Sequence, residues 1–265
     1  MGTDSNRRES TGSGRFLGSV EKAFKVLSAF NERRSPLSQT DVAKLSGVDK
    51  NSTQRVLYTL KALGYLRQSP DTRLYSLSAR LLEFGTTFLA GSRVREVATP
   101  ILEEVNRSCE ETVNLTEREG TEVVYVLRYP SRHVVSVDLS LGSRLPIYCT
   151  APGRAMLAHL PPHEAREILE ESVLDKRTPF TLTDPDAILR SLADVRSMGF
   201  CLTNQEAFVG DISVSSPVFD EKGAVVAAVN IAVPWPRWPL DQVEAELAPI
   251  VASAARSISQ TMAHR

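Results

Sequence analysis

Four polar side chains of this sequence have the type and spacing to bind another molecule: Asn51, Gln54, Arg55 and Tyr58. At about 100° per residue they share one face of a helix, and the opposite face carries Thr53, Val56, Leu57, Leu60 and Leu63. Amide and guanidinium groups form paired hydrogen bonds with base edges in the major groove of DNA. The pattern therefore predicts a helix that packs through its apolar face and reads bases through its polar face.

The preceding residues predict the elements that would hold this helix. Apolar residues recur at helical spacing and predict a first helix of about three turns. We expect this helix to supply the core of the small domain through Val20, Ala23, Phe24, Leu27 and Phe30. Ser38 and Asp41 have the spacing of a capping box, which would start a second helix. Gly47 allows a turn, and Asp49 can cap the third helix, whose N-terminus favours a nearby phosphate. Together they predict a helix-turn-helix.

A β-hairpin is predicted directly after the third helix. Residues 64–69 and 74–77 alternate between apolar and polar types, and a Pro-Asp pair supplies the turn. Such a hairpin is typical of a wing, on which Arg67 and Arg73 could meet phosphates or the minor groove. The alternative is a solvated hairpin with ordinary surface arginines. The candidate DNA-contacting residues are Ser38, Gln39, Thr40, Lys50, Asn51, Ser52, Thr53, Gln54, Arg55, Tyr58, Arg67 and Arg73.

The charge of the chain is divided along its length. The 265 residues carry a net charge of −1. Residues 1–92 contain 14 Lys and Arg against 8 Asp and Glu, whereas residues 93–265 contain 17 against 24. A basic first part that also holds the helix-turn-helix pattern favours double-stranded DNA as a partner, although a small domain can be basic without binding nucleic acid.

Composition argues against several other classes of protein. A hydrophobic content of 42% and a charged content of 24% are typical of a soluble globular protein. No apolar run of about 18 residues predicts a membrane span, so we expect a cytoplasmic protein without a membrane partner. Cys109, Cys149 and Cys201 form no CxxC pair, and the His residues do not fall at metal-ligand spacing with them. We therefore expect reduced thiols, no metal and no cofactor.

The segment 78–92 predicts a linker helix with an apolar surface. Leu82, Phe84 and Phe88 lie in a stretch with few charges, and a small domain has no room to bury them. A partner subunit is the expected cover, which predicts a homodimer whose recognition helices lie one DNA turn, about 34–36 Å, apart. The alternative is that this helix packs on the C-terminal domain of its own chain.

The remaining residues predict an α+β domain, in which an antiparallel sheet is flanked by helices. Alternating patterns predict strands at 112–118, 122–129, 133–139, 200–206, 211–219 and 224–233. Helical periodicity predicts helices at 94–111, 150–160, 163–172 and 184–198, and a final helix capped by Asp241.

This C-terminal part favours ligand binding over catalysis. Cys149 and His159 could be a nucleophile and its base, but their spacing does not bring them together, and Cys is most often a small buried hydrophobe. By contrast, Ser213 and Ser215 place hydroxyls on one side of a strand, and Asn230 interrupts an apolar strand. They predict a pocket that hydrogen-bonds a polar ligand, unless the side chains only satisfy the backbone.

Several ordered motifs resemble IclR-type transcriptional regulators. They are residues 51–57 (NSTQRVL), 63–66 (LGYL), 142–150 (GSRLPIYCT), 153–158 (GRAMLA), and 215–217 ahead of 227–234. The resemblance runs from about Phe16 to the C-terminus. Residues 143–150 are similar to the branch of that family that controls protocatechuate, 4-hydroxybenzoate and β-ketoadipate catabolism. The resemblance implies a winged helix-turn-helix, dimers often paired into tetramers, and a GAF-like domain that holds a small organic acid.

Carried over residue by residue, the resemblance implies an effector pocket formed by Thr150, Ala151, Pro152, Thr203, Asn204, Ser213, Asn230 and Ala232. Some members have Gly-Ala in place of the Ala-Pro pair and an acidic residue in place of the Thr-Asn pair, so their ligands do not transfer directly to this chain. A carboxylate ligand would also engage Arg128 and Arg144, unless these form structural ion pairs. The candidate effector-binding set further includes Asn114, Tyr148 and Ser215.

The expected organisation is a disordered tail at 1–15, a winged helix-turn-helix at 16–77, a linker helix at 78–92 and an effector-binding domain at 93–265. The expected function is transcriptional regulation, repressing or activating, in which a small organic acid from aromatic catabolism modulates binding to a pseudo-palindromic operator. The alternatives are an enzyme acting on a small aromatic or dicarboxylic acid with an appended DNA-binding domain, and an architectural DNA binder without a ligand.

Overall fold

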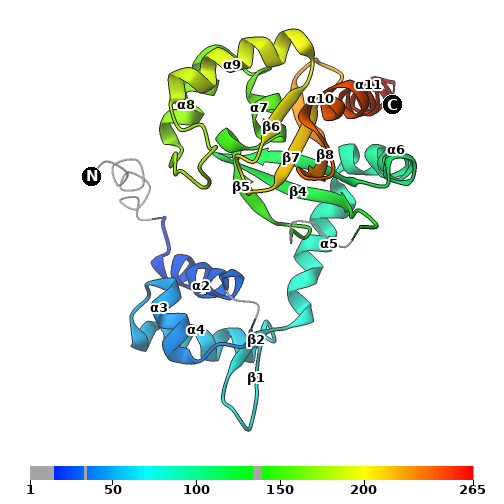
Figure 1. Cartoon of the computed structure of the whole chain (residues 1–265). Helices are drawn as coiled ribbons and strands as arrows, with labels where there is room; N and C mark the ends of the chain where they lie inside the picture. The colour runs from blue at the N-terminus through cyan, green and yellow to red at the C-terminus, as the bar shows by residue number, and fades with distance from the viewer. Residues whose placement is uncertain (1–14, 33–34, 134–138, 265) are drawn as a thin grey trace. The chain divides into compact units, whose positions relative to one another are not determined.

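The computed structural model describes residues 15–32, 35–133 and 139–264, which fall into two units. Unit 1 ends at Phe88 and unit 2 begins at Leu89, so the division lies within helix α5, Leu82–Gly91 (Figure 1). Residues 1–14 of the expected tail and residues 134–138 of the expected strand 133–139 lie outside the described residues.

The N-terminal unit is a three-helix core followed by a hairpin, as predicted. Its elements are α2 Gly18–Ser28, a short helix Ala29–Asn31, α3 Gln39–Ser46, α4 Lys50–Ala62, β1 Leu66–Gln68, β2 Tyr75–Leu77 and a short helix Ala79–Leu81. The capping box of Ser38 and Asp41 is confirmed, as is the cap of α4 by Asp49. Gly47 ends α3 at a φ of 66°, a left-handed conformation that glycine adopts without strain.

One detail of the first helix was predicted wrongly. Val20 and Phe24 were expected in the core, but they are exposed, and Val26 is the buried residue of α2. The core of this unit forms where Val26 meets Leu37, Val42 and Leu57 from the neighbouring elements. Helical spacing of apolar residues therefore covers more of the surface of α2 than the part that is buried.

The C-terminal unit is a six-stranded antiparallel sheet between two layers of helices, which confirms the α+β class (Figure 1). The strands are β3 Thr112–Glu119, β4 Glu122–Tyr129, β5 Arg144–Pro146, β6 Cys201–Asn204, β7 Asp211–Phe219 and β8 Val225–Pro234, in the order β5-β4-β3-β8-β7-β6. The helices are α6 Arg93–Cys109, a short helix Ile147–Cys149, α7 Ala151–Leu157, α8 Pro162–Glu171, α9 Pro185–Met198, α10 Leu240–Gln242, a π-helical turn Val243–Leu247 and α11 Ala248–Ala263.

The two faces of the sheet are covered by different helices. Helices α6 and α11 pack on one face over an apolar core, whereas α7 contacts β7 and β8 on the other and is backed by α8 and α9. Two sequence expectations fail here. Strand β5 was not among the predicted strands, because three residues are too few to show a period. The final helix starts after Pro239 rather than at Asp241, which lies in its first turn.

Candidate functional site

The polar face of α4 is open to solvent. Asn51, Gln54, Arg55 and Tyr58 are all exposed, and Tyr58 is 72% exposed although it is aromatic. Thr53 is a correction, because it is fully buried and its hydroxyl donates to the Val48 carbonyl at 3.1 Å. Thr53 therefore belongs to the packing face of the helix and cannot contact DNA.

Two serines of the candidate interface have internal roles. The Ser38 hydroxyl accepts from the Asp41 amide and donates to the Asp41 carboxylate at 2.6 Å, so it has no hydrogen left for a phosphate. The Ser52 hydroxyl accepts from Lys22 Nζ at 2.8 Å, and Lys22 also pairs with Asp49. The hydrogen bond from the Ser52 amide holds the pKa of Asp49 at about 2. Ser38 is therefore corrected from a DNA contact to a residue that caps α3. The positive charge of Lys22 partly neutralises the negative charge of Asp49 at the start of α4.

The hairpin is hydrogen-bonded to the C-terminal end of α4 through Gln68, which was not among the predicted residues. Gln68 accepts from Lys61 Nζ at 3.0 Å and donates to the Arg73 carbonyl at 3.0 Å. Arg67 and Arg73 are both exposed on this hairpin, and Gln39, Thr40 and Lys50 also reach the surface. Arg80 stacks on Tyr65 and donates to the Leu63 carbonyl. The arginines of the wing thus sit on a hairpin that is fastened to the recognition helix.

The C-terminal unit contains a cavity of about 250 Å³ on the face of the sheet covered by α7. Residues opposite each other in an antiparallel sheet project to the same face, and the register assembles the cavity wall in three rows. The rows are Asp211 with Pro234, then Thr203 with Ser213, Ala232 and Thr112, then Asn230 with Asn114 and Arg128. Residues distant in sequence thus meet because β3, β4, β6, β7 and β8 are in register.

The opposite wall is formed by the start of α7. Thr150 caps this helix, and Thr150, Ala151 and Pro152 line the cavity. Gly153 is required here, because a Cβ at this position would lie 2.0 Å from the Ile147 carbonyl oxygen. The close approach of α7 to the preceding turn therefore places the Thr-Ala-Pro segment over the sheet.

Five polar side chains of the cavity bear on its chemistry. Arg128 donates to Asn114 Oδ1 at 2.9 Å, and Asn230 Nδ2 donates to Ser213 Oγ at 3.0 Å. Asn230 Oδ1 is buried and has no hydrogen-bond partner among the described residues. Burial raises the pKa of Asp211 to about 7, opposed by the nearby Arg128. Among its lining residues the cavity thus has the Arg128 guanidinium, the Asp211 carboxyl with a pKa near neutrality, and the Asn230 amide oxygen, which has no partner among the described residues.

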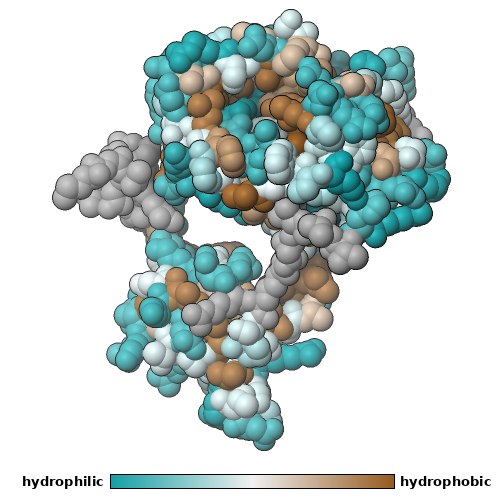
Figure 2. Space-filling model, in the orientation of Figure 1, coloured by the Kyte–Doolittle hydropathy of each residue, from teal (hydrophilic) through white to brown (hydrophobic). Residues whose placement is uncertain are grey.

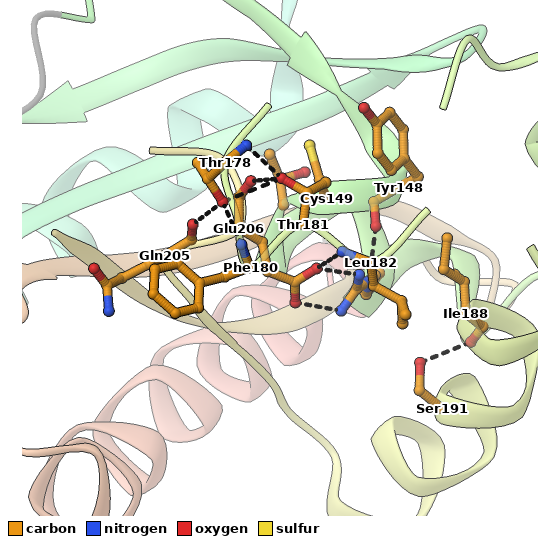
Figure 3. A network of polar contacts seen from close by, with 12 residues as sticks. Tyr148, Cys149, Thr178, Phe180, Thr181, Leu182, Ile188, Ser191, Gln205 and Glu206 are labelled. Carbon is orange, nitrogen blue, oxygen red and sulfur yellow. Dashed lines mark hydrogen bonds and ion pairs between the residues drawn. The ribbon is translucent and has the colours of Figure 1, made fainter. Parts of the chain in front are cut away.

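A buried polar network holds the loop that follows β6 and lines part of the cavity (Figure 3). Glu206 forms two hydrogen bonds with the Arg154 guanidinium at 2.7 and 2.6 Å, and Arg154 also donates to the Tyr148 carbonyl. The hydroxyls of Thr178 and Thr181 donate to the carbonyls of Gln205 and Glu206, both at 2.7 Å. Residues 206–210 line the cavity, so this network joins α7 to a loop that forms part of the cavity wall.

Four predicted effector-binding residues lie outside the cavity lining and are corrected. Arg144 is paired with Glu119 and Glu122, and Tyr148 donates to the Asp175 carbonyl within the core. Ser215 shares a row with Asn230, but it is fully buried and donates to the Val229 carbonyl. Asn204 follows Thr203 and therefore projects to the other face of β6.

The sequence interpretation missed several lining residues, among them Glu111, Tyr125, Glu206, Phe208 and Asp211. Glu111 is almost completely buried and forms an ion pair with Arg237 and a hydrogen bond with Trp238. A carboxylate at the end of a helix gives no sequence signal for burial. The position of Asp211, two residues before Ser213 on the same strand face, was a signal that could have identified it.

Comparison with known families identifies both units. Residues 19–70 match the IclR helix-turn-helix domain, and residues 86–260 match the bacterial transcriptional regulator IclR C-terminal domain. The chain belongs to the IclR family.

Relatives match nearly the whole IclR chain. It is 32% identical to the Pca regulon regulatory protein of Pseudomonas putida over 249 residues, which cover 94% of this chain and 85% of that protein. It is 31% identical over 223 residues to the p-hydroxybenzoate hydroxylase transcriptional activator of Acinetobacter baylyi, covering 81% and 80%. A solved IclR homolog of Microbacterium hydrocarbonoxydans, complexed with 4-hydroxybenzoate, has a TM-score of 0.77 at 26% identity and covers 92% and 98%.

These findings make the chain a DNA-binding transcriptional regulator of the IclR family with an effector-binding C-terminal domain, and not an enzyme. Cys149 and His159 do not form the nucleophile and base considered from the sequence. Burial raises the pKa of the Cys149 thiol to about 11, and the His159 ring is hydrogen-bonded to the Ala155 carbonyl instead. Across the described ranges, no cluster of His, Cys, Asp and Glu could hold a metal ion, and no helix is long and apolar enough to cross a membrane.

Proposed function

We propose that this IclR-family protein acts in the cytoplasm as a homodimer that reads a pseudo-palindromic operator and releases or rearranges it when an aromatic acid binds. The proposed domains are a winged helix-turn-helix at 16–77, a linker helix at 78–92 and an effector-binding domain at 93–265. The exposed Asn51, Gln54 and Arg55 of α4 would read base edges, and Arg67 and Arg73 of the wing would meet phosphates.

The ligand class follows from the polar groups of the cavity. Arg128 can pair with a carboxylate, and Asn230 Oδ1 requires a hydrogen-bond donor such as a hydroxyl. The small volume and the apolar side chains of the lining, including Leu145 and Phe208, suit a single ring. A hydroxy-substituted aromatic acid fits this arrangement, and two related proteins carry names that refer to such compounds.

The dimer is supported by the exposed apolar residues of the linker helix. Leu82, Phe84 and Phe88 are 67%, 61% and 56% exposed in the single chain, and Figure 2 shows apolar surface over α5. Large apolar side chains exposed to this extent on one short helix favour a protein partner. A second copy would bury these residues and place two recognition helices about 34–36 Å apart, and two such dimers could pair as a tetramer.

This proposal is carried by Asn230 Oδ1, which has no partner among the described residues and belongs to the same cross-strand row as Arg128, and a ligand screen tests it. Thermal unfolding of the full chain is measured with hydroxybenzoates, with their amides, which lack the carboxylate, and with benzoate, which lacks the hydroxyl. The hydroxybenzoates should raise the melting temperature most, and the best ligand should change affinity for an operator selected from random DNA. Stabilisation by no acid, together with little sequence preference, would instead indicate an architectural DNA binder.

A further inference from the structure

A β-bulge interrupts the sheet directly beside the cavity. Leu115 of β3 lies opposite Leu127 of β4, but the next residue, Thr116, lies opposite Tyr125. Val126 is therefore an extra residue without a partner on β3, and its side chain is buried in the core beneath α6 and α11. A bulge leaves a local gap in the ladder and gives the strand freedom to bend at that point.

The carbonyl of this extra residue is bound by an arginine of α6. Arg95 Nε donates to the Val126 carbonyl oxygen at 3.2 Å. The same guanidinium extends through Nη1 toward the Leu89 carbonyl oxygen at 3.5 Å, the long limit of a hydrogen bond. Leu89 is in the last turn of α5, where carbonyl groups have no partner within the helix. The Arg95 guanidinium thus donates to two backbone carbonyls, one at the bulge and one at the helix end, that have no partner within their own strand ladder or helix.

A second contact fastens the same joint to the neighbouring strand. Ser92 lies between α5 and α6, and its hydroxyl caps α6 by accepting from the Arg95 amide. The Ser92 hydroxyl also donates to Glu117 Oε1 of β3 at 3.0 Å. The end of the linker helix is therefore held to β3 through Ser92 and to the bulge of β4 through Arg95.

The bulge lies between two residues of the cavity wall. Tyr125 directly precedes Val126, and Arg128 follows it by two residues; both line the cavity. Arg128 is hydrogen-bonded to Asn114 on the adjacent strand, so a carboxylate that recruits this guanidinium must change or compete with that bond. The resulting shift of β4 would be taken up most easily at the bulge, where ladder hydrogen bonding is interrupted.

We propose that Arg95 is the positioning residue that transmits ligand binding at Arg128 to the C-terminal end of the linker helix α5. It does so by forcing the Leu89 carbonyl to follow the Val126 carbonyl. This inference rests on the proposed function, since it requires that an acid in the cavity changes DNA binding. Arg95 contacts neither the ligand nor DNA, so its role lies in the coupling between two affinities, which is a free energy of its own.

The test compares two arginines of the same helix in the full chain. Arg95→Met removes the guanidinium and keeps an apolar stem, and Arg95→Lys keeps the charge but cannot bridge both carbonyls. Arg93→Met is the matched control, because Arg93 donates to the Met262 carbonyl and pairs with Glu221, away from the bulge. Three affinities are measured for each protein: that for the hydroxybenzoate isomer that stabilises the wild type most, and those for the selected operator without and with this acid at saturation.

The ratio of the two operator affinities decides the outcome. In the wild type and in Arg93→Met it should differ from unity by about 5-fold to 150-fold, the usual range of coupling. In Arg95→Met it should fall below about twofold while the acid and the free operator are still bound, and Arg95→Lys should retain part of it. An unchanged ratio in Arg95→Met, or an equal loss in Arg93→Met, overturns the inference alone. A wild type that binds the acid without any change in operator affinity overturns the proposed function as well.

Hydrogen exchange in the wild type provides a check that does not depend on a variant. Binding of the acid should change the exchange of amides at 89–95 together with those at 124–128, because the two segments share Arg95. A change at 124–128 with none at 89–95 would also overturn the inference.

Discussion

Asn230 Nδ2 donates to Ser213 Oγ across two paired strands at 3.0 Å, and Oδ1 of the same amide is buried without a hydrogen-bond partner among the described residues, in a side chain that lines the cavity. A buried amide oxygen without a hydrogen bond costs free energy. A ligand that donates a hydrogen to this oxygen recovers that free energy. The pair therefore links the orientation of Asn230 to the affinity for the ligand.

Replacing Ser213 tests this relationship. Ser213→Ala removes the acceptor that orients Asn230, so the ligand dissociation constant should rise about 5-fold to 20-fold, equivalent to the roughly 1–2 kcal/mol of one hydrogen bond. Titration calorimetry with the best hydroxybenzoate measures it. The matched control is Ser215→Ala, which lies on the same strand face and loses a bond to Val229 outside the cavity lining. Equal losses of affinity in both variants would show that Ser213 has no specific role.

The carboxyl group of Asp211 should make stability depend on pH. Its pKa is about 7 in the folded chain against an ordinary 3.8, so between these values the folded state binds more protons than the unfolded state. The contribution of Asp211 to the free energy of unfolding should therefore decrease as pH rises from about 4 to 7 and stay low above pH 7. Asp211→Asn should remove this decrease and stabilise the protein at pH 8 by about 1–3 kcal/mol.

Urea unfolding at pH 5 and pH 8 measures the effect. Both tryptophans, Trp235 and Trp238, lie in the C-terminal unit, so their fluorescence reports the unit that contains Asp211. An equal change in stability for wild type and Asp211→Asn between the two pH values would contradict the predicted titration.

Breaking the buried pair of Arg154 and Glu206 should destabilise the C-terminal unit strongly. Glu206→Gln leaves the Arg154 guanidinium, which is 5% exposed, without its countercharge, and such a loss typically costs about 3–5 kcal/mol. Because Glu206 lies in the loop that lines the cavity, ligand affinity should fall as well. Glu164→Gln is the control, since its exposed pair with Arg118 should be worth at most about 1 kcal/mol. Similar urea midpoints for the two variants would refute the prediction.

Arg55 should contribute to sequence recognition. Arg55→Ala should weaken binding to the selected operator by about 1–3 kcal/mol more than binding to random DNA, if the guanidinium contacts a base edge. Fluorescence anisotropy with both DNAs at one salt concentration measures the difference. An equal loss of affinity for the operator and for random DNA would indicate that Arg55 contacts a phosphate and not a base.

Arg73 should contribute to affinity without sequence preference. It is exposed in the turn of the hairpin, where it can neutralise a phosphate. Arg73→Ala should reduce the slope of log affinity against log salt by about 1 and leave the ratio of operator to random DNA unchanged. A changed ratio with an unchanged slope would indicate a base contact instead.

The recognition helix and its supports were predictable from sequence because their signals are local. The caps at Ser38 and Asp49 and the four-residue polar face of α4 depend on neighbours within one or two turns, and the structure places them as expected. Thr53 was ambiguous only because a hydroxyl residue can be polar at a surface or bonded to the backbone when buried.

The cavity depended on contacts that no local pattern contains. Arg128 and Arg144 were both candidate partners for a carboxylate ligand on sequence grounds. Arg128 lines the cavity, whereas Arg144 is paired with two glutamates outside the cavity lining. Ser213 and Ser215 share a strand face, and only the covering helix decides which of them meets the cavity. The sequence by itself determined the family, the exposed polar face of α4 and the α+β class, because spacing along a chain encodes these. Tertiary structure alone decided which polar side chains meet in the cavity, because register between strands and the approach of α7 are set by packing over long distances in sequence.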